Sequence, residues 1–290
     1  QAKWSPFFAA LAERHELIDI VRPPTSKLDF AVDAALSFHP ERAVWARRFG
    51  LYPRTFDRRT RRLEQQLSHF DGKYDAIVQL QTCCAPGTTH RRYAIYTDNT
   101  YALTARHYPR FAQLPRRASK GVFAREAAVA NGAARVFTMS QFARQSFIDD
   151  YGCHPSRVVA IGAGPQRLER DISTRKYDKP TALFVGLELE RKGGLVLLES
   201  WRRVADAMPD AELVIVGAAP PPGASCPRVH WLGRVWDSEK LRTLFLEARL
   251  FVMPSLFEPW GLVFHEAMGH GLPCIGTDTC AMPEIIDDLE

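Results

Sequence analysis

The sequence predicts an α/β protein that consists of two doubly wound parallel sheets with helices on their faces. Short apolar runs rich in Val, Ile, Leu and Phe alternate with longer helical patterns along most of the 290 residues. A polar and charged stretch from Pro165 to Pro180 separates two such series. We therefore expect two domains, residues 1–165 and 166–290, that face each other across a ligand-binding cleft.

The composition argues against several classes of protein. The chain is 46% hydrophobic and 24% charged, has no apolar run long enough to span a membrane, and begins with no secretory signal pattern. Its six cysteines are scattered and none forms a C-x-x-C pair, which argues against a zinc site or a disulfide framework. We expect a reducing, cytoplasmic location. The net charge of +5 permits an anionic partner without requiring one.

The first series begins with a helix. Ser5 is a candidate N-cap before Pro6, the helix continues to Arg14, and the run Glu16–Val21 is predicted to be a strand. A doubly wound domain normally starts with a strand and a glycine-bearing loop, and only four residues precede this helix. We therefore expect the first strand of this domain to be missing.

The rest of the first series alternates between helices and strands. Residues 28–70 are predicted to be helical, residues 100–115 to form a polar and aromatic loop, and Ser140 and Gly152 to begin and end a helix over residues 141–151. A further helix is predicted over residues 120–131. The predicted strands are Tyr74–Leu80, Arg92–Tyr96, Ala134–Met139 and Arg157–Gly164.

The second series has the same alternation. Helices are predicted over Gly193–Met208, Ser238–Ala248 and Trp260–His270, and another begins at Ala281. Because the sequence stops there, we expect the closing helices of this domain to be missing as well. The predicted strands are Thr181–Val185, Ala211–Val216, Val229–Leu232, Arg249–Met253 and Leu272–Gly276.

A turn from Pro254 to Pro259 connects one buried strand to the helix that begins at Trp260. Pro259 suits the first turn of that helix, and Gly271 is placed to end it. The amides of Trp260, Gly261 and Leu262 would then lie at a helix N-terminus, which favours the binding of an anion such as phosphate. Glu258 lies just before this helix, and Glu266 lies within it.

This region resembles the acidic motif of the retaining glycosyltransferases of family 4, which have the GT-B fold of two Rossmann-like domains facing a cleft. The family pattern is roughly Ser-x-x-Glu-x-x-Gly-Leu-x-x-x-Glu-Ala-Met-x-x-Gly-x-Pro. The residues in register are Ser255, Glu258, Gly261, Leu262, Glu266, Ala267, Met268, Gly271 and Pro273. The resemblance is sharpest over residues 181–288 and weaker over residues 74–164.

A second motif follows the strand that ends at Gly186. Arg191 and Lys192 stand there before two glycines that open a helix, an arrangement typical of a phosphate site, although an Arg-Lys pair is by itself more often a solvated turn. In the resembled family, this loop supplies an arginine and a lysine to the donor diphosphate. Leu187 stands where the family usually has that arginine, so Arg191 is expected to take its role.

The resemblance implies a division of roles. Glu266 would hold the ribose of the nucleotide, Glu258 would hold hydroxyls of the transferred sugar, and the amides of residues 260–262 would meet the β-phosphate. Gly186, Arg191 and Lys192 would line the diphosphate site. With these cations in place and no Asp-x-Asp motif in a matching context, we expect no metal and no cofactor beyond the UDP-, GDP- or ADP-sugar donor. We also expect no protein nucleophile.

Weaker candidates lie outside these two motifs. Asp98 follows a predicted strand in the first domain and loosely matches a histidine of the family, with a turn cap as an equal alternative. Arg234 matches a loop near the nucleotide base in relatives. His265 and His270 lie on the motif helix, where a structural role is the commoner one.

Eight arginines gather between residues 42 and 62. A solvated basic face is the ordinary interpretation of such a run. The sharper ones are an anionic acceptor, such as a lipid-linked phosphate, or peripheral contact with an anionic membrane. Nucleic acid fits poorly, because no matching fold motif or set of stacking aromatics is present.

Together these features predict a retaining, metal-independent hexosyltransferase with a first, acceptor-side domain and a second, donor domain. The acceptor would be a carbohydrate, a lipid-linked molecule or a small molecule. Two alternatives stay open at this point. One is another GT-B enzyme, a phosphorylase or an epimerase, although neither Lys192 nor Lys240 stands in the context of a pyridoxal phosphate lysine. The other is a non-catalytic protein that binds a nucleotide sugar or a glycan.

Overall fold

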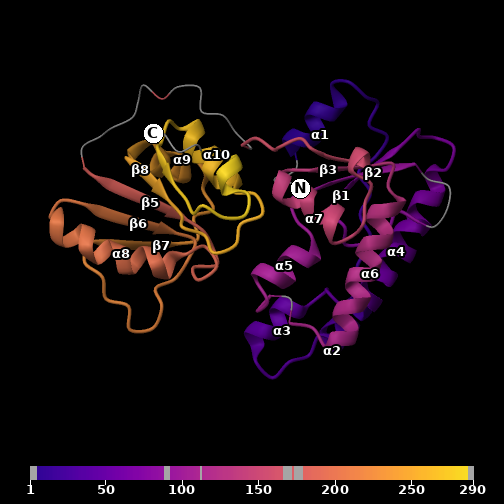
Figure 1. Cartoon of the computed structure of the whole chain (residues 1–290), viewed down its shortest axis with the longest axis horizontal. Helices are drawn as coiled ribbons and strands as arrows, with labels where there is room; N and C mark the ends of the chain where they lie inside the picture. Colours follow the sequence, from indigo (N-terminus) through magenta and orange to yellow (C-terminus); the bar gives the residue numbers. More distant parts are fainter. Residues whose placement is uncertain (1–4, 88–91, 112, 166–171, 173–178, 287–290) are drawn as a thin grey trace. The chain divides into compact units, whose positions relative to one another are not determined.

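The computed structural model describes residues 5–87, 92–111, 113–165, 172 and 179–286. The chain divides into two compact units, Gln1–Gly162 and Ala163–Glu290, and each is described by itself (Figure 1). The division falls close to the boundary that the sequence predicted after residue 165. Most of the predicted linker lies outside the described residues.

The first unit has a parallel sheet in which the strands lie in chain order, β1-β2-β3-β4. In register, Ile95 of β2 pairs with Val136 of β3. The core of this unit lies between the sheet and the helices around it. It includes Ile95, Val136, Phe147 and Val158, each of which has no more than 1% of its surface exposed. The strands are β1 (Ile77–Leu80), β2 (Tyr93–Thr97), β3 (Arg135–Thr138) and β4 (Val158–Ala160).

The helices of the first unit overlap the predicted helical segments, apart from α5 and the short turn η3. The segment predicted as a loop after residue 99 contains α5, because the Thr100 hydroxyl caps it by accepting a hydrogen bond from the Leu103 amide. The described helices are α1 (Ser5–Ala12), α2 (Lys27–Leu36), α3 (Arg42–Arg48), α4 (Pro53–Leu67), η2 (Ser68–Phe70), α5 (Tyr101–His107), α6 (Arg116–Gly132), α7 (Gln141–Asp149) and η3 (Pro155–Arg157).

The predicted strand at Glu16–Val21 is wrong. This segment has no regular secondary structure, and its apolar side chains at Leu17, Ile18 and Ile20 are exposed. The Asp19 carboxylate accepts a hydrogen bond from the Ile20 amide at 2.7 Å. In a strand, the Ile20 amide would instead donate a hydrogen bond to the neighbouring strand. The local bond to the Asp19 side chain therefore competes with strand formation.

The ends of α7 follow the predicted capping pattern. The Ser140 hydroxyl accepts a hydrogen bond from the Ala143 amide at 3.0 Å. Gly152 has φ of 66°, the left-handed conformation that commonly follows a helix end. Ser140 therefore has the structural role that the sequence favoured for it.

The second unit has a doubly wound parallel sheet with the order β7-β6-β5-β8-β9. From β5, the strands β6 and β7 follow in chain order towards one edge of the sheet. The next two strands, β8 and β9, lie on the other side of β5. The strand order therefore reverses between β5 and β8. The strands are β5 (Thr181–Val185), β6 (Glu212–Val216), β7 (Val229–Gly233), β8 (Leu250–Val252) and β9 (Cys274–Ile275).

Among its described residues, four helical segments accompany this sheet: α8 (Gly194–Ala207), α9 (Ser238–Glu247), α10 (Leu262–Gly269) and the single 3₁₀ turn η4 (Met282–Glu284). Because parallel crossovers are right-handed, the reversal puts α8 on one face of the sheet and α9 and α10 on the other. Phe184, Phe251 and Phe264 are fully buried between these layers. Within the described residues, the helix expected from Ala281 is only the η4 turn.

Among the helices that the structure describes, none has both the length and the hydrophobicity needed to cross a membrane.

Candidate functional site

The candidate site lies where the strand order of the second sheet reverses. Leu183 of β5 pairs with Phe251 of β8, so the loops that follow these two strands start side by side. In open α/β sheets, ligands bind at this switch point, beyond the carboxyl ends of the strands. The loops are residues 186–193, which lead to α8, and residues 253–261, which lead to α10.

A glycine allows the two loops to touch. Gly193 has φ of 72°, and a Cβ atom at this position would lie 1.7 Å from the Pro254 carbonyl oxygen. The Leu256 amide also donates to the Arg191 carbonyl oxygen at 2.9 Å. No side chain fits between these backbones, so the Arg191-Lys192 loop is held against the loop that carries Glu258.

Three neighbouring strands end in glycine at this same edge: Gly186 after β5, Gly217 after β6 and Gly233 at the end of β7. The Gly217 amide donates to the Gly233 carbonyl oxygen at 2.6 Å. A Cβ atom on Gly217 would lie 2.6 Å from the Gly186 carbonyl oxygen. The edge is therefore bare backbone at three adjacent positions, which would let a ligand approach the peptide groups closely.

Glu258, Lys192 and Arg191 form an ion cluster between the two loops. The Lys192 ammonium lies 2.5 Å from Glu258 Oε2, and Arg191 Nη1 lies 3.4 Å from the same oxygen. Glu258 is only 7% exposed, so this carboxylate depends on its two cations for charge compensation. The structure thus brings together three residues that the sequence assigned to one site.

Arg191 is held from several sides. Its Nε donates to the Glu188 carboxylate at 2.6 Å, and its Nη1 donates to the Phe257 carbonyl oxygen at 2.8 Å. Burial opposes the charge on this guanidinium, but the carboxylates of Glu258 and Glu188 outweigh burial and raise the pKa of Arg191. Glu188 is not among the residues that the sequence pattern predicted for the site. The one sequence feature that could have identified Glu188 is its position three residues before the Arg-Lys pair.

The start of α10 differs from the prediction. The helix begins at Leu262 rather than Trp260, with Gly261 as its N-cap residue. The Leu262 amide donates to the Trp260 carbonyl oxygen at 3.1 Å. Of the three amides proposed for phosphate binding, that of Leu262 is therefore engaged. The Trp260 and Gly261 amides have no backbone acceptor among the described residues.

The indole of Trp260 explains the later start. It is 9% exposed, its Nε1 donates to the Ala163 carbonyl oxygen at 3.1 Å, and its ring lies 5.1 Å from the His265 ring. These contacts fix Trp260 as a buried anchor before the helix, whereas the sequence pattern placed it in the first turn. They lie within the second unit.

Glu266 lies on α10 and is half-buried. Burial raises the pKa of its carboxyl group above the usual value. Its neighbours differ in role. His270 Nδ1 donates to the Glu266 carbonyl oxygen at 2.7 Å, and its ring stacks on Phe245, which is structural. Burial lowers the pKa of His265, whose Nε2 has no partner among the described residues.

Arg234 follows β7, at the same edge of the sheet as the three glycines. Its guanidinium carbon lies 5.7 Å from the centroid of the Trp236 ring, and Trp236 is 84% exposed. A cation above an exposed indole forms a flat, polarisable surface, which suits stacking or hydrogen bonding with a ligand. The structure is compatible with the contact predicted for Arg234, which stays a prediction.

Asp98 belongs to the first unit and is therefore described apart from the ion cluster. It follows β2, at the carboxyl end of that sheet, and its Oδ1 accepts a hydrogen bond from Gln81 Nε2 at 3.0 Å. Asn99, the other candidate for a turn cap, donates from Nδ2 to the Thr104 hydroxyl. The catalytic role of Asp98 stays a prediction.

Among the residues described in the structure, no group of three or more His, Cys, Asp or Glu side chains is arranged to hold a metal ion.

Comparisons with known proteins point to one family. Residues 179–290 match the family described as glycosyl transferases group 1. The alpha-maltose-1-phosphate synthase of Mycolicibacterium smegmatis is 28% identical over 125 residues, 38% of this chain and 32% of that protein. The phosphatidyl-myo-inositol mannosyltransferase of Mycobacterium leprae is 31% identical over 118 residues, 38% of this chain and 31% of that protein. Each match thus spans about a third of the curated relative.

Solved structures show the same fold. WaaG, a glycosyltransferase involved in lipopolysaccharide biosynthesis, has a TM-score of 0.68 at 16% identity. The superposition covers 99% of this chain and 80% of the WaaG chain. Anabaena Alr3699/HepE in complex with UDP has a TM-score of 0.56 at 17% identity, with 78% of this chain and 66% of that chain covered. Residues 179–290 thus resemble the glycosyl transferases group 1 family, and the two α/β units have the GT-B fold.

Proposed function

We propose that the protein transfers a sugar from a nucleoside diphosphate sugar to an acceptor, with retention at the anomeric carbon. One observation carries the proposal. Lys192, Arg191 and the buried carboxylate of Glu258 meet at the switch point of a sheet that lies within the family match. Such a cluster supplies cations for a diphosphate and an acceptor of hydrogen bonds for a sugar at one place.

The diphosphate would bind between the two loops. Lys192 and Arg191 would neutralise its charge, and Gly194, at the start of the 14-residue helix α8, adds the positive end of a helix dipole. The amides of Trp260 and Gly261 would approach the β-phosphate. Because these groups stabilise the charge of a leaving nucleoside diphosphate without a metal, we propose a metal-independent reaction with no cofactor besides the donor.

The two acids would have different roles. Glu266, whose raised pKa reflects a partly desolvated position, would accept hydrogen bonds from the ribose hydroxyls. Glu258 would accept hydrogen bonds from hydroxyls of the transferred sugar. The bond between the anomeric carbon and the phosphate oxygen would break on the same face on which the acceptor oxygen bonds to that carbon. The departing phosphate would take the acceptor proton, so no protein nucleophile is needed.

The nature of the neighbours supports the donor class. One solved neighbour is bound to UDP, and another, the starch synthase IV of Arabidopsis thaliana, is bound to ADP and acarbose. By analogy, we propose a UDP-, GDP- or ADP-sugar as donor and a carbohydrate, a lipid-linked molecule or a small molecule as acceptor. The second unit would bind the donor and the first unit the acceptor. We expect the reaction to take place in the cytoplasm.

A donor screen tests the proposal. Isothermal titration calorimetry with UDP, GDP, ADP and their sugars should show binding to one nucleotide class. Lys192→Ala should weaken that binding by about tenfold or more, because it removes a charge-assisted contact. Lys240→Ala, on the exposed first turn of α9, is the matched control and should bind as the wild type does. Absence of binding to every nucleotide would contradict the proposal.

A transfer assay then separates the functional alternatives. With the donor that binds, product formation that persists in EDTA and retains the anomeric configuration by NMR supports the full proposal. Nucleotide-sugar binding without transfer to any acceptor would favour a binding protein. Sugar release that requires inorganic phosphate would favour a phosphorylase.

A further inference from the structure

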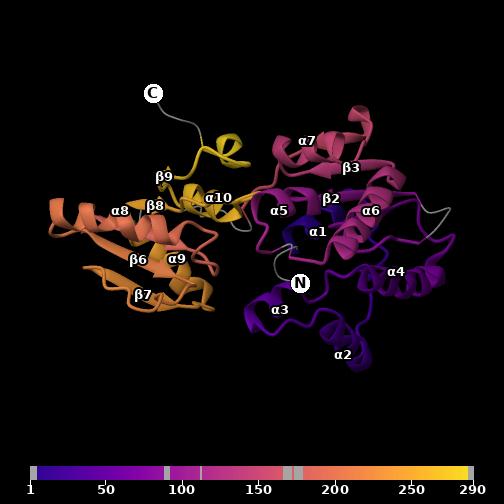
Figure 2. The same cartoon turned by 60° about the horizontal axis from the view of Figure 1, so that its bottom comes forward.

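Helix α2 of the first unit has its polar and apolar faces reversed. A surface helix normally turns apolar side chains to the core and charged side chains to water. In α2 the two acids, Asp29 and Asp33, are only 6% and 4% exposed, whereas Leu28 and Phe30 are 73% and 59% exposed. Figures 1 and 2 show α2 and α3 at one end of the first unit, away from its sheet.

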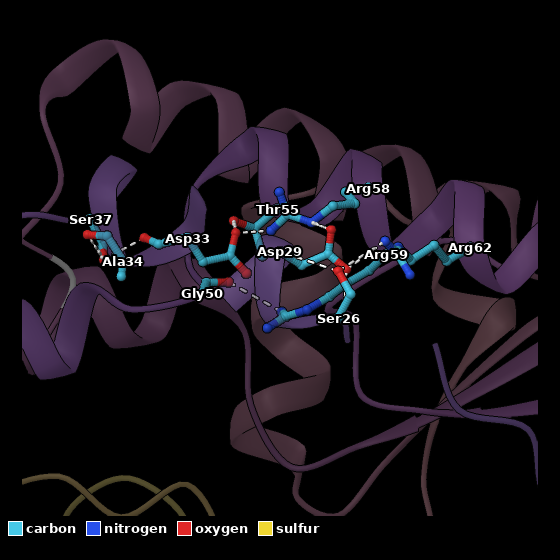
Figure 3. A network of polar contacts seen from close by, with 10 residues as sticks. All are labelled: Ser26, Asp29, Asp33, Ala34, Ser37, Gly50, Thr55, Arg58, Arg59 and Arg62. Carbon is cyan, nitrogen blue, oxygen red and sulfur yellow. Dashed lines mark hydrogen bonds and ion pairs between the residues drawn. The ribbon is translucent and has the colours of Figure 1, made fainter. Parts of the chain in front are cut away.

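The buried acids attach α2 to α4 (Figure 3). Arg62 Nη2 lies 2.6 Å from Asp29 Oδ2, and Arg58 pairs with both Asp29 and Asp33. The Thr55 hydroxyl donates to Asp33 at 2.6 Å. Polar contacts thus hold α2 in place, and its apolar face is left free for another use.

Aromatic contacts fix the other end of this element. Phe38 lies edge-on to Trp45 of α3, and the Trp45 indole nitrogen donates to the Ala34 carbonyl oxygen at 2.8 Å. Phe30 packs against Phe49 with ring centroids 4.9 Å apart. Both Phe30 and Phe38 nevertheless keep more than half of their surface exposed. The apolar side chains are therefore presented on an ordered element.

We name these exposed side chains the α2 patch: Leu28 at 73%, Phe30 at 59%, Val32 at 39% and Phe38 at 63% exposed. Large apolar groups gathered on one surface element mark an interaction site more often than scattered single residues do.

The charge of this region indicates the chemistry of the partner. Residues 22–62 contain ten Lys and Arg against four Asp and Glu, a net charge of +6, while the whole chain has +5. The net positive charge of the protein is thus concentrated around the α2 patch. A bilayer with anionic headgroups matches both features, because it offers an apolar interior behind an anionic surface.

The structure also shows which cations are available to such a partner. Arg58 and Arg62 are paired with Asp29 and Asp33, and Arg59 donates to the Gly50 carbonyl oxygen. These arginines of the predicted basic region therefore serve the fold. The cations of residues 22–62 that are exposed among the described side chains are Arg22, Lys27, Arg42, Arg54 and Arg61.

We propose that the α2 patch docks the protein on an anionic lipid surface. Leu28, Phe30 and Phe38 insert at the boundary between headgroups and acyl chains, and the exposed cations of residues 22–61 meet anionic headgroups. The ion pairs to α4 keep the acids of α2 away from the lipid. This contact is independent of the donor site in the second unit, so it can hold or fail separately from the proposed transferase activity.

Vesicle flotation tests the docking surface. The wild-type chain should float with vesicles of phosphatidylcholine and phosphatidylglycerol and much less with phosphatidylcholine alone. The double variant Leu28→Ser/Phe30→Ser should lower the bound-to-free ratio by about tenfold or more, because each inserted apolar side chain contributes strongly to partition. Salt at about 1 M, where the Debye length is about 3 Å, should also weaken binding.

A matched control is available on α8 of the second unit. Leu195 and Val196 are 47% and 48% exposed, so Leu195→Ser/Val196→Ser removes two partly exposed apolar side chains elsewhere and should leave vesicle binding unchanged. Soluble glycerol phosphate should not compete, since the proposal requires a lipid surface rather than a free phosphate.

Three results would overturn the proposal: no binding to anionic vesicles, equal binding by the Leu28→Ser/Phe30→Ser variant, or equal binding to neutral vesicles. Light scattering adds a separate readout. A wild-type dimer that this variant dissociates, with no vesicle binding by either protein, would identify the α2 patch as a contact between two copies of the chain.

Discussion

At the scale of single residues, the ion cluster has a consequence for donor binding. Lys192 and Arg191, the cations proposed to hold a diphosphate, are already paired with the Glu258 carboxylate. A diphosphate that arrives between the loops must share these cations with that carboxylate or replace it. At the proposed site, Glu258 would therefore compete with the leaving group while it holds the cations in place.

The first prediction concerns Glu258. Glu258→Gln should bind the free nucleoside diphosphate several-fold to about tenfold more tightly, because it removes a negative charge next to the phosphates. The same change should lower the turnover of sugar transfer, because the carboxylate is proposed to hold the sugar hydroxyls. Calorimetry with the nucleotide alone and initial rates with the full donor measure the two effects separately.

Glu199→Gln on the exposed surface of α8 removes the same charge outside the cluster and should change neither quantity. Weaker nucleotide binding by Glu258→Gln would show that the carboxylate chiefly positions Lys192 and Arg191 instead of competing with the phosphates.

The second prediction concerns Glu266 and pH. Its pKa is raised by burial, and a ribose hydroxyl donates better to the carboxylate than to the carboxyl group. Nucleotide affinity should therefore fall as pH is lowered through this raised pKa, at a higher pH than an exposed glutamate would give. Glu266→Gln should bind more weakly at neutral pH and lose this pH dependence.

The stability of the fold gives an independent check on Glu266. A raised pKa means that the buried charge disfavours the folded state above that pKa, and protonation relieves the penalty. This contribution to the free energy of unfolding should increase as pH falls from above the raised pKa towards the ordinary value. If Glu266→Gln shows the same pH dependence as the wild type in binding and in unfolding, the effect comes from another group.

At the scale of elements, Gly193 decides whether the two site loops can touch. The third prediction is that Gly193→Ala loses about 3 kcal/mol or more of unfolding free energy, because the new Cβ atom would overlap the Pro254 carbonyl oxygen and the residue has positive φ. Chemical denaturation measures the loss. Nucleotide binding should weaken as well, because the Arg191-Lys192 loop must move.

Gly223 provides a matched control for the backbone term. It has φ of 74°, close to that of Gly193, but a Cβ atom there would meet nothing within 4 Å. Gly223→Ala should therefore lose only about 1 kcal/mol. Equal losses in the two variants would show that φ alone, and not the contact between the loops, requires a glycine at position 193.

The sequence predicted an element correctly where its hydrophobic pattern and its capping residues indicate the same boundaries. It failed where contacts with distant residues determine the local structure. The strands and helices of the second unit alternate with clear caps and glycines, so their order along the chain is enough to put the Arg191-Lys192 loop and the Glu258 turn at one edge of a sheet. The pairing of Glu258 with both cations could not be predicted in this way, because it depends on the close approach of Gly193 to Pro254.

The failures have local physical causes. Pro259 predicts that the helix begins at Trp260, but the buried indole anchors this residue outside the helix. The run Glu16–Val21 has the apolar content of a strand, but no described strand pairs with it. The basic residues of 42–62 suggest a solvated face, whereas Arg58 and Arg62 turn inward to the acids of α2.

At the scale of the whole molecule, the contacts proposed for the diphosphate all come from the second unit. The candidate residue of the first unit is Asp98, which follows β2 at the carboxyl end of its own sheet. In a two-domain enzyme of this fold, a group from the acceptor unit would act only once donor and acceptor are both in place. Donor binding and sugar transfer should therefore respond differently to a change at this position.

The final prediction is that Asp98→Asn lowers the turnover of sugar transfer by about 10²-fold, a typical effect of removing one group that handles a proton or orients a reactant, while nucleotide affinity in calorimetry stays the same. Asp75→Asn is the control, because Asp75 is exposed and precedes β1 at the opposite end of the sheet. It should leave both measurements unchanged. A drop in nucleotide affinity for Asp98→Asn would place this carboxylate in the donor site, and unchanged turnover would leave it as a partner of the Gln81 amide only.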